Sequence, residues 1–209
     1  MAAAGAESGV DFPRVARDDG RLVFRARSLT QNPAVADLDV RQRTLPNART
    51  PSSRAVTWQV TDVSADGRTL ALYSPEPPAD IWVVDSDGKN LRQVTSDGAN
   101  NRLPRFTADR RLVFYSKRTG TYQAFRINTD GSGVEPLTAF ASGLITYPQL
   151  SRDGLTLLFA DSSRAAAEAT GPWPASRTQV RPLSRAVVDG IPITPLSYSP
   201  DERYIVGNR

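Results

Sequence analysis

The side chains that could carry chemistry in this sequence are carboxylates, hydroxyls, tyrosines and two lysines, because its 209 residues include neither histidine nor cysteine. These absences exclude Ser-His-Asp and Cys-His nucleophiles, thiolate or imidazole zinc sites, iron–sulfur clusters and disulfides. The acids Asp66, Asp109, Asp153 and Asp201 could supply the carboxylate pair that a glycosidase needs. They recur at matched positions, however, and a residue that returns in every repeat usually serves the repeat. We predict turn aspartates and no catalytic residue.

Two short motifs match known sites but fit a turn better. Residues 85–90 (Asp-Ser-Asp-Gly-Lys-Asn) offer closely spaced oxygen ligands for calcium, yet no bidentate glutamate follows at the right distance. Ser86 and Lys89 have the spacing of a lysine-activated serine, which requires a helix, whereas Gly88 indicates a turn. We therefore predict a hairpin turn here and expect neither a metal ion nor a cofactor.

Trp173 is the one aromatic residue that we predict to contact a partner. It is flanked by Pro172 and Pro174 within residues 162–178, which resemble a surface insertion with one helical turn at residues 164–169. Aromatic anchors commonly carry much of the binding energy at protein interfaces. The other large aromatic residues are expected to pack between sheets: Trp58, Trp82, Tyr115, Phe125 and Phe159.

The charge pattern argues against nucleic-acid binding. The chain has 26 basic and 22 acidic residues, a net charge of +4, and its arginines are interleaved with acids rather than gathered. No apolar run approaches the roughly 20 residues that span a bilayer, so no membrane span is predicted. Residues 1–10 lack the basic and apolar regions of a secretory signal and are expected to form a flexible tail.

The elements that must position these residues follow an internal repeat. The four aspartates named above lie 43, 44 and 48 residues apart, each two positions after Ser or Thr, and an earlier copy fits at Asp19. A strand that ends in an Asp-Gly turn gives a second marker, with Asp87 and Asp130 43 residues apart. Thr95 and Thr138 give a third marker with the same spacing. Three markers that keep one period indicate a repeat architecture.

Each repeat contains about four strand-like runs joined by tight turns, and this is the pattern of a β-propeller blade. We predict an all-β fold: a β-propeller of four-stranded antiparallel blades, with about four to five repeats in the chain. After the tail, residues 11–209 would form the repeats, with units near 13–50, 55–96, 101–139, 145–185 and a partial unit at 190–209.

Two segments carry a family resemblance. Residues 198–201 (Tyr-Ser-Pro-Asp), together with the strand-turn-strand run at residues 81–95, resemble the TolB-type β-propeller repeat, and the resemblance extends over about residues 13–209. This repeat is shared by periplasmic TolB proteins, by the propellers of dipeptidyl-peptidase and prolyl-oligopeptidase enzymes, and by sensor regions of regulators. It implies a location in the periplasm or cell envelope.

The number of repeats and the resemblance together set the functional expectations. Propellers of this type typically close with about six or seven blades, so the chain is expected to be an incomplete propeller, with the missing blades in a longer chain or a partner. The leading hypothesis is a non-enzymatic scaffold or binding module for a protein or peptide. The alternatives are a substrate-gating propeller of a serine peptidase whose catalytic domain is absent from this chain, and a sensor propeller of a transcriptional regulator or kinase.

Overall fold

The computed structural model describes residues 10–15, 22–26, 33–37, 39, 41–42, 47–48, 57–162, 165–183, 187–188, 191–199 and 201–208. The tail predicted at residues 1–10 lies outside these residues except for Val10, which begins the first strand. The early aspartate repeat at Asp19 also lies outside them.

The described residues form antiparallel sheets, each built from consecutive strands. The second sheet comprises β4 (Gln59–Val63), β5 (Thr69–Tyr73), β6 (Ile81–Asp85) and β7 (Arg92–Gln93). The third sheet comprises β8 (Arg102–Phe106), β9 (Leu112–Ser116), β10 (Gln123–Ile127) and β11 (Glu135–Pro136). The fourth sheet comprises β12 (Thr146–Leu150), β13 (Thr156–Ala160), β14 (Ala166–Thr170) and β15 (Val180–Pro182). In all three sheets neighbouring strands pair in chain order, which confirms the predicted four-stranded blades.

Shorter sheets precede and follow these three. The first sheet has three described strands, β1 (Val10–Val15), β2 (Leu22–Ala26) and β3 (Pro33–Ala36). The fifth sheet is the pair β18 (Thr194–Tyr198) and β19 (Ile205–Asn208), and a small pair, β16 (Val187–Val188) and β17 (Ile191–Pro192), lies before it in the chain.

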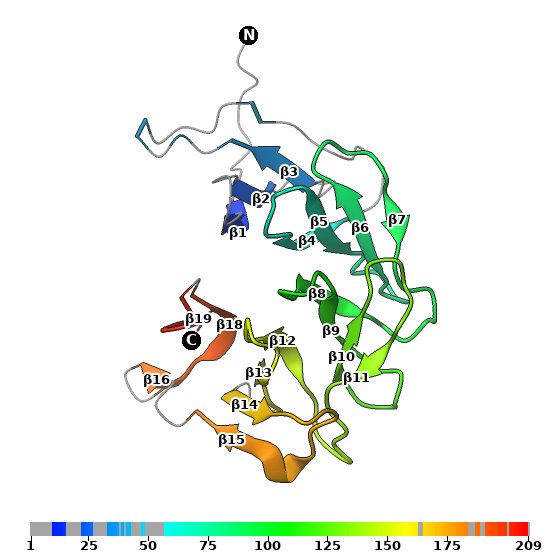
Figure 1. The fold of residues 1–209 in the computed structure, drawn as a ribbon, viewed down its shortest axis with the longest axis vertical. Helices are drawn as coiled ribbons and strands as arrows, with labels where there is room; N and C mark the ends of the chain where they lie inside the picture. The colour runs from blue at the N-terminus through cyan, green and yellow to red at the C-terminus, as the bar shows by residue number, and fades with distance from the viewer. Residues whose placement is uncertain are drawn as a thin grey trace.

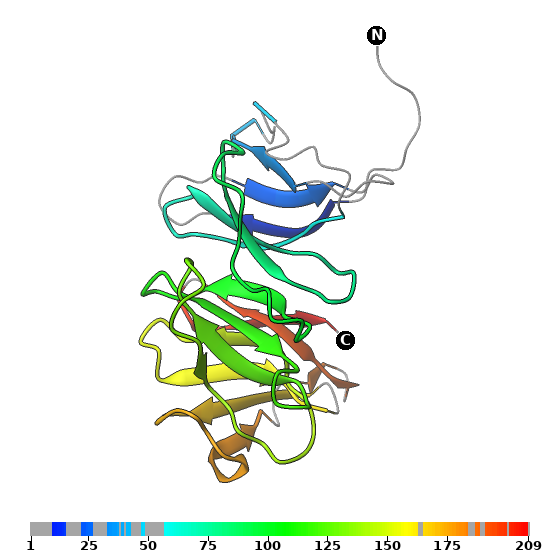
Figure 2. The same cartoon turned by 90° about the vertical axis from the view of Figure 1, so that its right-hand side faces the viewer.

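The sheets succeed one another around a common centre, as in a propeller. Figure 1 shows the first strands β1, β4, β8, β12 and β18 toward the middle and the last strands β3, β7, β11 and β15 toward the outside. In the side view of Figure 2 the sheets follow each other from the blue strands at the top to the orange strands at the bottom. The predicted all-β, propeller-like architecture is confirmed.

The hydrophobic core lies between neighbouring sheets rather than within one layer. One cluster joins Val35 of the first sheet to Trp58 and Leu70 of the second. A second cluster joins the second and third sheets, and a third joins Phe159 and its neighbours in the fourth sheet to Leu137 after β11. Sheets that are covered on both faces need runs of consecutive apolar residues, which explains why all five residues of β9 are buried.

The segment around residues 164–169 corrects one prediction. Instead of a helical turn in an insertion, residues 166–170 form β14, which pairs with all five residues of β13. Ala166, Ala167 and Ala169 are buried, the last two within the cluster between the third and fourth sheets. Alanine favours helices, but that preference is weak and yields to packing when small side chains are needed between two sheets.

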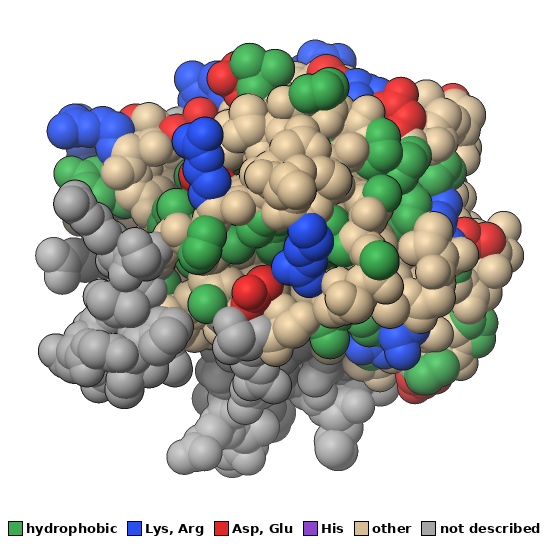
Figure 3. All heavy atoms as spheres, turned by 90° about the horizontal axis from the view of Figure 1, so that it is seen from below, with side chains coloured by type: hydrophobic (Ala, Val, Ile, Leu, Met, Phe, Trp, Pro, Cys, Tyr) green, Lys and Arg blue, Asp and Glu red, His purple; other side chains and the backbone are tan. Residues whose placement is uncertain are grey.

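The surface carries both signs of charge. On the face drawn in Figure 3, basic and acidic side chains are interspersed among polar and hydrophobic ones. Within the described part of the chain, no helix has the length and apolar character needed to cross a membrane.

Candidate functional site

The four recurrent aspartates each close a hairpin turn between the first two strands of a sheet. The hydroxyls of Ser64, Ser151 and Ser199 donate to the aspartate two residues later, over 2.7, 2.6 and 2.6 Å, and Thr107 donates to Asp109 in the same way. Each hydroxyl also accepts a backbone N–H from the first residue of the following strand or from the residue just before it. The predicted turn role of these aspartates is confirmed.

The turn of the third sheet lacks the glycine found in the turns of the second and fourth sheets. Gly67 and Gly154 follow their aspartates with φ of +68° and +73°, and Arg110 adopts nearly the same conformation, with φ of +64°. This left-handed conformation strains a residue that has a Cβ atom. The turn keeps its shape and its Thr107–Asp109 contact without the glycine, as does the turn of the fifth sheet, where Glu202 has a φ of +56°.

The turn carboxylates are poor candidates for acid catalysis. The hydroxyl of Ser151, followed by the N–H of Leu155, holds the pKa of Asp153 below its usual value. Burial acts to raise the pKa of Asp109, but hydrogen bonds from Thr107 and Arg111 lower it overall. A glycosidase acid needs a raised pKa, so these groups do not match that chemistry.

The other two motifs also form a turn. Asp87 accepts the backbone N–H of Lys89 over 3.0 Å and pairs with its ammonium group, while Asn90 donates to Asp85 over 2.7 Å. Ser86 is buried and the Lys89 side chain is 79% exposed, so they do not face each other in a protected site. Among the described residues, no group of three or more acidic side chains is placed to hold a metal ion.

A cleft of about 540 Å³ lies where the turns of the third and fourth sheets face each other. We call it the turn cleft, and residues 107–109, residues 150–154, Arg126 and Trp173 line it. This volume is within the range of small-ligand and peptide pockets, about 300–1,000 Å³.

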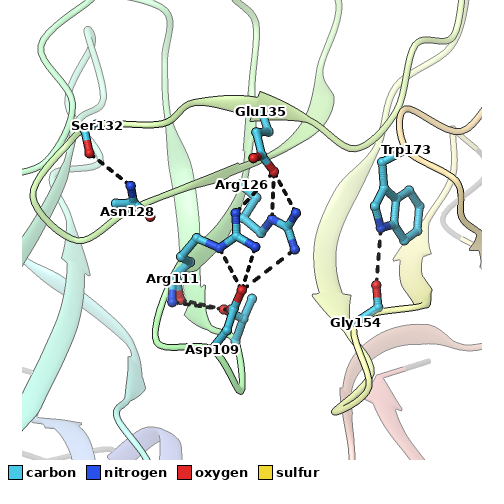
Figure 4. Close-up of polar contacts among 9 residues, drawn as sticks. Asp109, Arg111, Arg126, Asn128, Ser132, Glu135, Gly154 and Trp173 are labelled. Carbon is cyan, nitrogen blue, oxygen red and sulfur yellow. Dashed lines mark hydrogen bonds and ion pairs between the residues drawn. The ribbon is translucent and has the colours of Figure 1, made fainter.

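Asp109 and Arg126, which line one side of the turn cleft, belong to an ion-pair network with Arg111 and Glu135, shown in Figure 4. Glu135 accepts hydrogen bonds from Arg126 over 2.6 and 3.1 Å and from Arg111 over 3.2 Å. Arg111 also donates to Asp109 over 2.7 Å. Both arginine side chains are more than three-quarters buried, so the network is a fixed wall rather than a set of mobile surface charges.

The other side of the turn cleft carries Trp173. Its indole Nε1 donates to the carbonyl oxygen of Gly154 over 3.2 Å (Figure 4). Its ring is partly buried and packs against the core cluster between the third and fourth sheets. Nearby, Ala175 donates to Leu137 and accepts from Ala139, which ties this segment to the third sheet. Trp173 is therefore held on the blade and exposes only part of its ring. Its contact with a partner remains a prediction.

Sequence reasoning missed the ion-pair network. Arg126 and Glu135 lie directly opposite each other in the register of β10 and β11. An alignment of these two strands from the sequence would therefore have predicted this cross-strand charge pair. Arg111 and Asp109 join it through the preceding turn, whose place beside β11 depends on tertiary structure.

Comparison with known proteins places the fold. Residues 15–208 match the model of the TolB beta propeller domain. A segment of 78 residues is 32% identical to the Tol-Pal system protein TolB of Helicobacter hepaticus, covering 36% of this chain and 19% of that protein. The crystal structure of TolB from Acinetobacter baumannii has a TM-score of 0.69 at 17% identity, covering 97% of this chain and 49% of that one.

The fold is also found in an enzyme. The structure of a puromycin-hydrolyzing peptidase from Mycobacterium tuberculosis has a TM-score of 0.62 at 14% identity, covering 89% of this chain and 30% of that one. The chain thus corresponds to half or less of each of these proteins.

Proposed function

The chain belongs to the TolB β-propeller family, and from that premise we propose that it is a non-enzymatic binding module whose turn cleft holds a protein or peptide partner. The H. hepaticus relative is named as a protein of the Tol-Pal system, which favours a protein partner here as well. The chain has no histidine or cysteine, and its recurrent aspartates are engaged in turns, which favours binding over catalysis.

The observation that carries this proposal is the placement of Trp173. Its N–H is already satisfied by Gly154, and its segment is hydrogen-bonded to the neighbouring sheet, so the ring is held in the wall of a cleft before any partner arrives. An anchor that is ordered in advance loses little conformational entropy on binding. Aromatic residues beside a pocket are also the residue type most often responsible for binding energy.

Selection of peptides from a random library on the purified chain tests the proposal. We expect selected peptides to bind the Trp173→Leu variant at least tenfold more weakly than the unchanged chain. Tyr204→Ala is the matched control, because Tyr204 is an exposed aromatic residue outside the turn cleft, and it should bind normally. Equal binding by Trp173→Leu would rule out the turn cleft as the site.

The same preparation tests the absence of enzyme activity. Chromogenic peptide and glycoside substrates should be hydrolysed no faster than in buffer. The gating-propeller alternative makes a different prediction. The selected peptides would be substrates of a peptidase domain that belongs to the same protein but lies outside this chain, and that domain would contain a Gly-x-Ser-x-Gly motif.

A further inference from the structure

The charged groups in and around the turn cleft are not all paired with one another. On the third-sheet side, Arg111 and Arg126 are paired with Asp109 and Glu135, so two positive and two negative groups neutralise each other. On the fourth-sheet side, Arg152 and Asp153 both line the cleft, but Asp153 is half of no ion pair: within the described part of the chain, neither Arg152 nor any other basic side chain lies within ion-pair distance of its carboxylate.

The partners of Asp153 are neutral and come from its own turn. One carboxylate oxygen, Oδ1, accepts from the Ser151 hydroxyl over 2.6 Å and from the N–H of Leu155 over 2.9 Å. These bonds fix the direction of the carboxylate and keep it ionised, while Asp153 itself is exposed at the cleft wall. The second oxygen, Oδ2, is left to accept from a ligand.

Trp173 lines the turn cleft together with Asp153. Its Nε1 donates to the carbonyl of Gly154, the residue that follows Asp153, so the ring and the carboxylate belong to one wall of the turn cleft. With its only donor satisfied, the indole offers a ligand the negative face of its ring. An aromatic face next to an unpaired carboxylate attracts a cation through two effects, the cation–π interaction and a charge-assisted hydrogen bond.

We propose that the turn cleft selects a positively charged side chain of its peptide partner, an arginine or a lysine, which lies against the Trp173 ring and pairs with Asp153. The proposal rests on the proposed function and adds the chemical class of the anchor residue. The fixed network on the opposite side supports it, because Arg111 and Arg126 are already neutralised and their positive charges are offset where the cation would enter.

Capped pentapeptides with a single varied residue test this directly. Acetylated and amidated Gly-Gly-X-Gly-Gly, with X as arginine, lysine, norleucine or glutamate, would be titrated into the isotope-labelled chain. The indole N–H signal of Trp173, assigned by its loss in Trp173→Phe, should shift saturably with the arginine and lysine peptides. It should move at least fivefold less with the norleucine and glutamate peptides, and raised salt should weaken the response.

Matched variants assign the effect to Asp153. Asp153→Asn keeps an oxygen that accepts the turn hydrogen bonds but removes the charge, and we expect it to bind the arginine peptide at least fivefold more weakly. Asp201→Asn is the control, because Asp201 occupies the equivalent turn of the fifth sheet, accepts from Ser199 in the same way, and does not line the turn cleft. Equal weakening by both substitutions would show a general charge effect and overturn the proposal.

The outcomes separate this inference from the function on which it rests. If library peptides bind through Trp173 but lack basic residues, or if the glutamate peptide binds as well as the arginine peptide, the cation preference is wrong and the binding function stands. If library peptides bind independently of Trp173, the proposed site fails, and the cation preference fails with it.

Discussion

Asp62 accepts a hydrogen bond from the backbone N–H of Phe106 over 2.8 Å, so that a side chain of the second sheet holds the inner strand of the third. Gln149 makes the same contact two joints further on, between the fourth and fifth sheets, where it accepts from the N–H of Tyr198 over 3.1 Å. The equivalent position of the third sheet is Arg105, whose guanidinium has donors but no acceptor. The joint between the third and fourth sheets, where the turn cleft lies, is therefore built without this contact.

Removing the contact at Asp62 should loosen the joint between the second and third sheets. We expect Asp62→Ala to lower the free energy of unfolding by about 1.5–3 kcal/mol, the range for losing a hydrogen bond to a charged group. Asp62→Asn keeps an acceptor oxygen and should lose less. Urea denaturation followed by circular dichroism measures both, and equal stability of the alanine variant and the unchanged chain would contradict the role given to this bond.

Gly131 tests the close approach of a third-sheet turn to the second sheet. Its φ is +90°, and a Cβ atom there would lie 2.8 Å from the carbonyl oxygen of Val94. Gly120 has a similar φ of +96°, yet a Cβ atom there would have nothing within 4 Å. Gly120→Ala should therefore cost only the backbone strain, about 1–2 kcal/mol.

We expect Gly131→Ala to cost more than Gly120→Ala, by roughly 1–3 kcal/mol, because the Val94 carbonyl must move. The two variants share the same change in composition, so the difference between their unfolding free energies isolates the contact. A larger loss for Gly120→Ala would mean that the two turns are not packed as described.

The fold could be predicted because its determinants are local and repeated. The Ser-x-Asp turns and the Asp-Gly turns each depend on a few adjacent residues, so Asp66 and Asp153 mark the same point in two blades. The residue types that favour such turns can be recognised at single positions of a sequence. The period then sets the number of strands in each blade.

The turn cleft could not be predicted because it depends on residues from different blades. Arg126 and Trp173 come together only when two sheets stack, and the sequence indicated Trp173 as an anchor without the residues that face it. The strand at Ala166–Thr170 was missed for a related reason. Its alanines fit the narrow space between two sheets, and the width of that space cannot be inferred from the neighbouring residues in the sequence.

That correction leads to a further prediction. Ala167 is 2% exposed in the core between the third and fourth sheets, so Ala167→Leu should overpack it and lower stability by about 1–3 kcal/mol. Ala65→Leu is the control, because Ala65 lies exposed in a turn and should change stability by less than about 0.5 kcal/mol. A surface helix at these residues would tolerate both substitutions equally, and thermal melts distinguish the two cases.

Acid should unfold the protein through its turns. The pKa of Asp66 is lowered first by the Ser64 hydroxyl and then by the N–H of Arg68, and the pKa values of Asp153 and Asp201 are lowered by the same kind of bonds. A carboxylate with a lowered pKa in the folded state stabilises the fold fully above its unfolded pKa, about 3.9. That stabilisation is lost as the pH falls through the folded value.

We therefore expect the melting temperature to be flat near neutral pH and to fall steadily from about pH 5 downward. Asp66→Asn should make this fall shallower, because asparagine can accept the turn hydrogen bonds at every pH but does not titrate. Glu76→Gln is the control for removing one negative charge, since Glu76 is exposed in the loop between β5 and β6. If Asp66→Asn kept the full pH dependence, the acid sensitivity would have to come from other carboxylates, and the Ser64–Asp66 bond would be a feature of the turn without influence on acid stability.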